Sequence, residues 1–249
     1  MGGTILNMIT VAIGSTLGLL IGGRLPHKIQ ESVVTGLGLV TLFVGFSNAG
    51  QTGNVIVPLI SLVIGVVLGE ILDLDAALQR LAGWLQKRFA PTRGAATEEA
   101  AGDTRARFIT GFVTASLVFC IGPLTFVGSI QDGMGLPIGF QQLAIKSVLD
   151  GFAGMAFAAS FGVGVSFSIL TVLFVQGGLA LAGSGAGYFM SAPMIDEMTA
   201  VGGLLLIGLG LVLLDIKRPR MANFLPALVI APLLVALAGA VGINIYPFS

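Results

Sequence analysis

The chain has 249 residues, of which 55% are hydrophobic and 10% are charged, and its formal net charge is zero. A soluble domain carries about 25% charged residues, so a chain this poor in charge is not built to face water on all sides. The neutral balance gives no electrostatic footprint for nucleic acid. The one cysteine, Cys120, excludes a disulfide framework and a cysteine-based metal site. We therefore predict an integral membrane protein.

Long apolar runs follow one another along the chain. A transmembrane helix needs about 20 predominantly apolar residues, whereas strands of a membrane barrel would alternate apolar and polar residues over roughly ten. The predicted spans are residues 4–23, 32–49, 54–72, 108–130, 140–160, 163–184, 198–216 and 221–242. We predict an all-α, polytopic membrane helix bundle of about eight transmembrane helices, forming a single membrane domain over residues 1–249.

The lysines and arginines are distributed unevenly between the two sides that eight spans would create. Eleven of the 12 fall after the first, third or seventh span, and the remaining one, Lys146, lies inside the fifth span. Because the cytoplasmic loops of membrane proteins are rich in Lys and Arg, this asymmetry favours eight spans with both termini outside. Seven spans would place the cluster Lys217, Arg218 and Arg220 on the wrong side.

The segment between the third and fourth spans, residues 73–107, has two parts. Its first part has apolar residues at helical spacing, with basic residues on the other face, which predicts an amphipathic helix at the inner membrane interface. The apolar positions are Leu74, Leu78, Leu81, Leu85 and Phe89. An extension of the third span into the cytoplasm is the alternative. Residues 91–107 are small and polar, and predict a flexible tether.

Two stretches of the chain resemble each other. Residues 35–45 align with residues 200–210, which pairs Gly38 with Gly203 and Gly45 with Gly210. Spans one to three (repeat one, 1–72) would then recur as spans six to eight (repeat two, 163–249), around central helices at 108–160. An offset of five helices inverts the second copy, and inverted repeats are typical of secondary transporters. The alternative is that helices rich in Gly and Leu look alike by composition.

The costliest polar group in the predicted bilayer is Asp150, near the middle of the fifth span. Lys146 lies four residues earlier on the same helix face. Ionisable residues inside the hydrocarbon are expensive and usually face a cavity or a partner, so we predict an ion or proton site here. The alternative is a pair that only locks helices together. Asn7 lies nearer an interface, where polar groups cost less, and has less weight.

Further candidate residues surround this position. Gly122 and Pro123 interrupt the fourth span, and a proline frees backbone carbonyls that can bind a cation. An ordinary proline kink is the alternative. Gln176 lies near the middle of the sixth span, where it could face Asp150 or only bond between helices. Gln131 and Asp132, at the outer end of the fourth span, predict an outer gate or secondary site.

Motifs of soluble enzymes are absent from the sequence. No zinc-protease, nucleophile-elbow or Walker motif occurs, and no cluster of Cys and His has the spacing of metal ligands. The glycine-rich strings lie inside apolar spans, so they predict close helix packing rather than phosphate binding. We expect no enzyme activity, no cofactor and no metal.

Four segments resemble a known family. They are residues 108–133 (FITGFVTASLVFCIGPLTFVGSIQDG), 146–151 (KSVLDG), 200–203 (AVGG) and 223–232 (NFLPALVIAP). On these segments, the first of which is quite specific, the chain resembles the YdfK/YqgA-like family of bacterial membrane proteins, a domain-of-unknown-function family. The resemblance covers essentially the whole chain and implies a bacterial inner-membrane location, but no activity. Relatives often have an acidic residue where this chain has Thr110, which weakens any mechanism that needs a carboxylate there.

These observations favour a secondary transporter or exchanger of an ion or small solute, with Asp150 as the midplane carboxylate. An ion channel and a non-transporting membrane scaffold or sensor are the alternatives. The expected partners are the lipid bilayer, a small ion or solute and further copies of the chain in a homo-oligomer. Nucleic acid is not expected.

Overall fold

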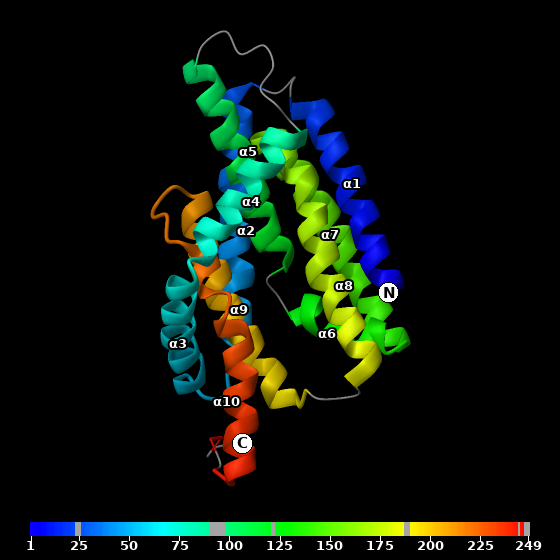
Figure 1. The fold of residues 1–249 in the computed structure, drawn as a ribbon, viewed down its shortest axis with the longest axis vertical. Coiled ribbons are helices and arrows are strands. Elements are labelled where there is room, and N and C mark those ends of the chain that lie inside the picture. Colours follow the sequence, from blue (N-terminus) through cyan, green and yellow to red (C-terminus); the bar gives the residue numbers. More distant parts are fainter. Residues whose placement is uncertain (23–25, 90–97, 121–122, 187–189, 244, 247–249) are drawn as a thin grey trace. The chain divides into compact units, whose positions relative to one another are not determined.

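The computed structural model describes residues 1–22, 26–89, 98–120, 123–186, 190–243 and 245–246. The described residues form helices and no strands (Figure 1), which confirms the predicted fold class. Six helices are long and apolar enough to cross a membrane, or up to eight if each of two bent pairs of helices is one span. The bent pairs fall at the predicted third and fourth spans. The protein is therefore a multi-pass membrane protein.

The helices form two compact units. Unit 1 comprises Met1–Leu37, Ala76–Cys120 and Leu124–Gly187, and unit 2 comprises Gly38–Asp75, Ile121–Pro123 and Tyr188–Ser249. The elements of unit 1 are α1 (Gly2–Gly22), most of α4 (Leu74–Phe89), α5 (Glu98–Cys120), α6 (Pro123–Gly133), α7 (Pro137–Phe161), the short 3-10 helix η1 (Val163–Phe167) and α8 (Ser168–Ala186). The elements of unit 2 are the second half of α2 (His27–Ala49), α3 (Ile56–Leu72), α9 (Ala192–Leu213), the 3-10 helix η2 (Met221–Phe224) and α10 (Ala227–Val241).

In unit 1, α1 and α7 lie side by side along their whole length (Figure 1). Gly14, Gly18 and Gly22 recur every fourth residue on α1 and face the α7 backbone between Gly151 and Ala159. A Cβ atom at any of the three would overlap that backbone. Small residues allow such close approach between membrane helices. The two helices therefore run parallel and form one seam, here called the α1–α7 seam.

A second close approach joins α6 to α8. A Cβ atom on Gly133 of α6 would overlap the carbonyl of Ala180, and one on Gly183 of α8 would overlap the carbonyl of Ile130. This contact, here called the α6–α8 seam, follows a sharp bend, because α6 is turned by 65° from α5. The predicted break in the fourth span is thus visible as the end of α5 at Cys120 and the start of α6 at Pro123.

Helix α4 forms where the sequence predicts an amphipathic helix, but Leu81 and Phe89, which were assigned to its apolar face, are exposed. Its place at the inner membrane interface stays a prediction. Ala82 and Leu85 are buried against Phe108 of α5, whereas Leu81 and Trp84 are exposed. The expected tether differs from the structure, since residues 98–107 belong to α5. Their sequence begins with two glutamates and two alanines, which are strong helix formers, and acidic residues favour a helix N-terminus. The rest of the tether, up to residue 97, lies outside the described residues.

The predicted seventh span also begins too late. It was expected at 198–216, but α9 starts at Ala192. Ser191 is the N-cap of this helix and Pro193 is in its first turn, two signals that mark helix starts. The earlier start places Glu197 in the second turn of a helix rather than before one.

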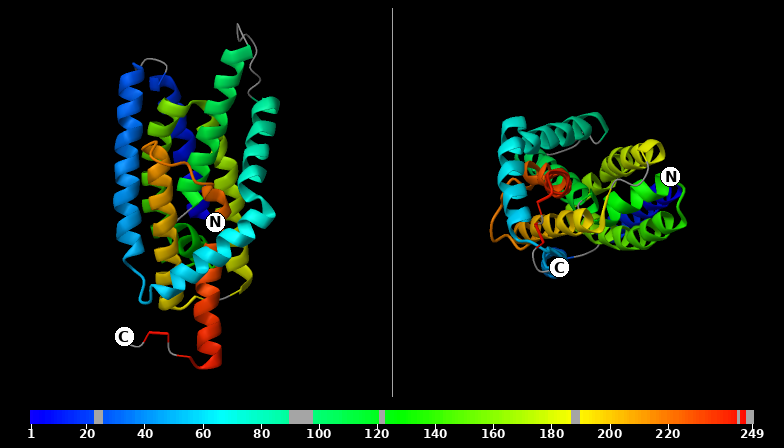
Figure 2. Two further views of the ribbon diagram at one scale, coloured as in Figure 1. Left: turned by 90° about the vertical axis from the view of Figure 1, so that its left-hand side faces the viewer. Right: turned by 90° about the horizontal axis from the view of Figure 1, so that it is seen from below.

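In unit 2, α2 and α9 run antiparallel in close contact (Figure 2). The carbonyl oxygen of Gly38 would lie 3.3 Å from a Cβ atom placed on Gly210. Likewise, the carbonyl oxygen of Gly203 would lie 2.9 Å from a Cβ atom placed on Gly45. Helices α3 and α10 also pack on each other, and Gly65 of α3 meets Ala227 at the start of α10. Unit 2 is therefore a bundle of helices from both ends of the chain.

Candidate functional site

Helix α7 carries the predicted pair of ionisable residues in the interior of unit 1. The Lys146 ammonium donates a hydrogen bond to Oδ2 of Asp150, one turn further along the helix. Each of these side chains is only 8% exposed. The amide Nδ2 of Asn7, from α1, donates to the same Oδ2 atom at 2.9 Å. The structure thus places Lys146 and Asp150 together and adds Asn7, and we call these three residues the α7 centre.

The α1–α7 seam explains why Asn7 reaches Asp150. Asn7 is fully buried and lies on the same stripe of α1 as Gly3, Val11 and Gly14, all of which are buried. The small residues of the stripe bring the α1 backbone close enough for a short side chain to cross to α7. This partner was missed because depth along a span does not say which face a residue occupies. The signal was present, since Asn7 is in register with the glycine stripe.

Gln176 of α8 is fully buried, and neither atom of its amide has a hydrogen-bond partner in the described part of the structure. Helix α8 runs parallel to α5, with the hydroxyls of Ser116 and Thr171 2.9 Å apart. Gln176 lies five residues after Thr171, and α5 ends at Cys120, four residues after Ser116. Gln176 is therefore level with the break after Cys120. The ring of Phe119 in turn faces Gly154, one turn beyond Asp150 on α7. Gln176 therefore lies at the level of the α7 centre.

Other buried polar atoms of unit 1 also lack partners within the described part of the structure. They are Oγ1 of Thr4, Oδ1 of Asn7, Oγ of Ser129, Oε1 of Gln131, Oε1 of Gln142 and Oγ of Ser166. Thr4, Asn7 and Ser129 are at most 3% exposed. Buried polar side-chain atoms are hydrogen-bonded in the large majority of cases, so each unpaired one marks a position that a water molecule, an ion or a solute can complete. Chemically, the site offers one ion pair together with spare hydrogen-bond donors and acceptors.

Asp132 and Gln131 do not join the α7 centre. The Asp132 carboxylate accepts a hydrogen bond from the backbone N–H of Gly3 at 3.1 Å, at the N-terminus of α1. The backbone of both residues lies against Gly139, near the start of α7. Because a helix rises 1.5 Å per residue, Gly139 is about 16 Å from Asp150 along the axis. Asp132 therefore holds the start of α1 in place, where its negative charge suits the helix dipole.

The break between α5 and α6 is described only in part. Gly122, predicted to contribute to the site, lies outside the described residues. Pro123 is the first residue of α6, where its missing N–H costs no helix hydrogen bond. In the same region, the hydroxyl of Thr125 donates to the carbonyl of Phe119 at 3.1 Å and thus bridges the break.

A buried carboxylate in unit 2 was not among the predicted site residues. Glu197 of α9 is fully buried and accepts hydrogen bonds from the Thr52 hydroxyl at 2.7 Å and the backbone N–H groups of Gly53 and Asn54 at 3.0 and 3.1 Å. Burial, followed by the Glu197 charge, raises the pKa of Tyr246 to about 12. With three donors on its oxygens, Glu197 holds the loop before α3.

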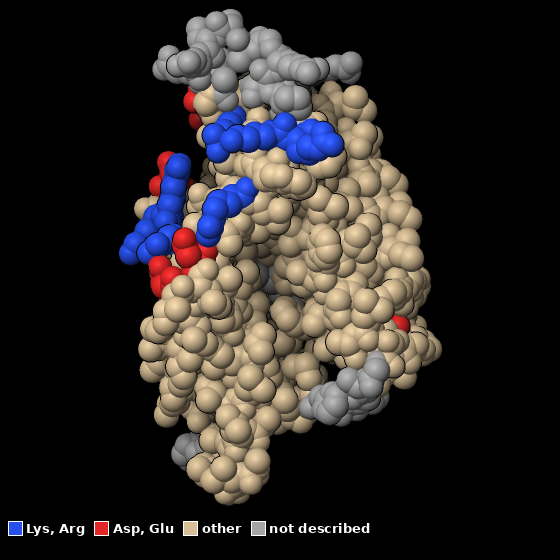
Figure 3. Space-filling model, in the orientation of Figure 1, with Lys and Arg blue, Asp and Glu red and all other residues tan. Residues whose placement is uncertain are grey.

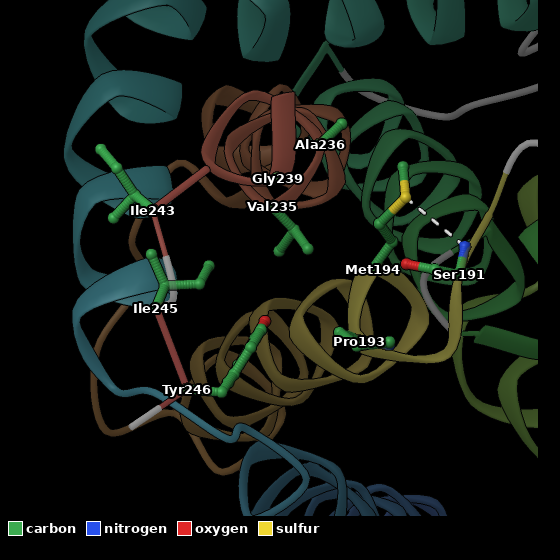
Figure 4. A pocket seen from close by; sticks show the side chains of 9 residues that line it. All are labelled: Ser191, Pro193, Met194, Val235, Ala236, Gly239, Ile243, Ile245 and Tyr246. Atoms are coloured by element: carbon green, nitrogen blue, oxygen red, sulfur yellow. Dashed lines mark hydrogen bonds between the residues drawn. The ribbon is translucent and has the colours of Figure 1, made fainter. Parts of the chain in front are cut away.

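Unit 2 also has a cavity of about 270 Å³ between the start of α9 and the end of α10 (Figure 4). Its walls are mainly apolar, including Val235, Ala236, Ile243 and Ile245, and the Tyr246 hydroxyl points into it. Among the described residues, no Asp, Glu, Lys or Arg lines it. In the described residues, no group of three or more His, Cys, Asp or Glu could hold a metal ion. The α7 centre is therefore the candidate functional site.

Comparison with known proteins gives the family. The family model described as "Protein of unknown function (DUF554)" matches residues 2–236. The uncharacterised protein YqgA of Escherichia coli (strain K12) is 32% identical over 230 residues, which cover 92% of this chain and 94% of YqgA. The uncharacterised membrane protein YdfK of Bacillus subtilis (strain 168) is 27% identical over 248 residues, covering 98% of this chain and 100% of YdfK. No solved structure matches. The chain therefore belongs to the DUF554 family of proteins of unknown function.

Proposed function

We propose that the protein is a secondary transporter or exchanger of an ion or small solute, rather than an enzyme, and that the α7 centre binds what it carries. The observation that carries this proposal is the pair Lys146–Asp150, with both side chains 8% exposed inside a bundle of apolar helices. A buried ion pair contributes little net stability, because removing two charges from water costs about as much as their attraction returns. Ionisable residues within membrane spans usually belong to ion or substrate pathways.

The unpaired polar atoms argue against a purely structural pair. A pair that only locks helices together would be expected to satisfy its neighbours as well, because each unpaired buried group costs about 1–3 kcal/mol. Instead, Asn7 uses its amide nitrogen on Asp150, and among the described residues its Oδ1 has no donor and the amide of Gln176 has no partner on either atom. In a site that alternates between empty and occupied states, such groups are unpaired when the site is empty and bind the ligand when it is occupied.

The α2–α9 contact supports an inverted repeat, the arrangement typical of secondary transporters. In the sequence alignment Gly38 corresponds to Gly203 and Gly45 to Gly210. In space Gly38 meets Gly210 and Gly45 meets Gly203, so each contact has its counterpart in the other copy. A two-fold axis in the membrane plane would produce such reciprocal contacts. We extend the proposal to a bacterial inner membrane with both termini outside, on the distribution of Lys and Arg.

Most of the surface carries no charged side chain, which is what a membrane location requires. Charged side chains gather in patches on the visible face, and broad areas between them have none (Figure 3). Many large apolar side chains are exposed, including Phe43 at 74% and Phe174 at 75%. Such surfaces are compatible with lipid and not with water.

The test uses purified protein in liposomes, with an imposed pH gradient and with neutral amino acids, inorganic cations and inorganic anions offered in turn. We expect the parent to move at least one of these classes and Asp150→Asn to lose that flux. Asp215→Asn is the matched control, because Asp215 forms an exposed pair with Arg218. Equal flux in the parent and Asp150→Asn contradicts the proposal. Flux at single-channel rates in a planar bilayer would assign a channel instead.

A further inference from the structure

The α7 centre has no net charge before anything binds to it. Lys146 and Asp150 neutralise each other, and Asn7 adds no charge. The side chain of Gln176, at the same level, is neutral as well. A bare cation or anion bound here would leave one uncompensated charge in a desolvated site, which is costly inside a membrane. A load without net charge avoids that cost.

The unpaired atoms of Asn7 and of Gln176, which lies at the level of the centre, include both donors and acceptors. Nε2 of Gln176 is a donor, and Oε1 of Gln176 and Oδ1 of Asn7 are acceptors. The hydroxyl of Thr4, one turn before Asn7 on α1 and also unpaired among the described residues, can act as either. An inorganic cation could pair only with the acceptors, and an inorganic anion only with the donors. A solute with both kinds of group can satisfy both.

Resting on the proposed function, we infer that the load at the α7 centre is a small solute without net charge that has both hydrogen-bond donors and acceptors, specifically an amino-acid zwitterion. The juxtaposed charges favour a zwitterion over an uncharged solute. The ammonium group of such a ligand matches the Asp150 carboxylate and Oδ1 of Asn7. Its carboxylate matches the Lys146 ammonium and Nε2 of Gln176.

The ion pair leaves positions for these contacts. Both hydrogen bonds to Asp150, from Lys146 and from Asn7, are on Oδ2, and Oδ1 accepts neither of them. An ammonium has three N–H donors, of which Lys146 uses one on Asp150. A zwitterion can therefore add to the pair, with opposite charges next to each other, and does not have to displace either partner.

The experiment measures thermal unfolding of the purified full-length protein with a mixture of glycine, alanine and serine as the probe. Sodium gluconate and choline chloride, in parallel, test the inorganic cation and anion. We expect a saturable rise in Tm with the amino acids only. In Gln176→Leu the apparent affinity should fall roughly tenfold or more, because the ligand loses its contacts with one amide. Gln141→Leu, at an exposed position on α7, is the matched control and should bind as the parent does.

Gln176→Leu should fold at least as well as the parent, because it removes a buried amide that has no partner in the described part of the chain. Gln176→Met gives a second, unbranched replacement. The inference is overturned if the amino acids do not raise the Tm of the parent, if only a salt does, or if both Gln176 variants bind like the parent. The proposed function survives each of these results as long as Asp150→Asn abolishes a flux that the parent shows in liposomes.

Discussion

The buried ion pair leads to a stability prediction that can be worked out from the structure. At an effective dielectric constant of about 20, two charges about 4 Å apart attract each other by roughly 4 kcal/mol. Removing one partner from a buried pair leaves an unpaired charge and costs about 3–5 kcal/mol. We therefore expect Lys146→Met and Asp150→Asn each to lower the free energy of unfolding by this amount. The double variant should recover to within about 1–2 kcal/mol of the parent, because it buries no charge.

The assay is reversible unfolding in mixed detergent micelles, applied to the parent, both single variants and the double variant. The exposed pair Asp215–Arg218 provides the control, since its side chains are 74% and 77% exposed. Removing either partner there should cost less than about 1 kcal/mol, because solvent screens exposed pairs. Each set of variants forms a double-mutant cycle, and the difference between the two coupling energies measures how much burial changes the cost of breaking an ion pair on a helix.

Liposome flux then separates a structural pair from a functional one. The Lys146→Met/Asp150→Asn variant is expected to be folded and inactive. The reasoning about burial is refuted if the single variants cost as little as those of Asp215–Arg218. The reasoning about function is refuted if the folded double variant transports at the rate of the parent.

Three further predictions concern packing, a buried carboxylate and pH. Gly14→Ala should destabilise the protein by at least about 1–3 kcal/mol, because the added methyl group would overlap the Gly151 carbonyl. The control is Gly36→Ala, which has nothing within 4 Å and should be neutral or stabilising by up to about 1 kcal/mol. Equal effects of the two substitutions would argue against the α1–α7 seam. Glu197→Gln should lower the free energy of unfolding by about 1–3 kcal/mol, because an amide cannot accept all three hydrogen bonds at this site; an unchanged denaturation midpoint would contradict the description of that site. Because folding raises the pKa of Tyr246 from 10.0 to about 12, the folded state holds this proton more tightly, so the stability it contributes is present below pH 10 and is lost as the pH rises towards 12. Tyr246→Phe should remove this loss in pH-dependent unfolding, and parallel curves for the two proteins would contradict it.

Much of the fold follows from the length of the apolar runs. A stretch of about 20 apolar residues can satisfy its backbone in lipid only as a helix, so the existence and order of the spans were predictable. Their ends depend on local signals, which is why Ser191 and Pro193 move the start of α9. The grouping of helices into two units depends on which glycine faces which backbone, and spacing along one helix does not reveal the partner.

The candidate site was predictable where it depends on energetic cost. Asp150 and Lys146 are expensive in hydrocarbon wherever they point, so both were found without contacts. Asn7 is cheap enough to lie almost anywhere, and only the approach of α1 to α7 gives it a role. For Asp132, cost alone was misleading. Its carboxylate accepts a hydrogen bond from the backbone N–H of Gly3 at a helix end and does not belong to the α7 centre.

The two glycine seams of unit 1 meet at the start of α7. The α1–α7 seam carries Asn7, Lys146 and Asp150, the α6–α8 seam carries Gln176, and the backbone of α6 lies against Gly139 of α7. Helices whose backbones touch have no side chains between them that could change rotamer, so we expect these helices to move together near Gly139. Any relative movement of the two seams would be hinged at that contact and would be larger at the α7 centre, about 16 Å further along α7.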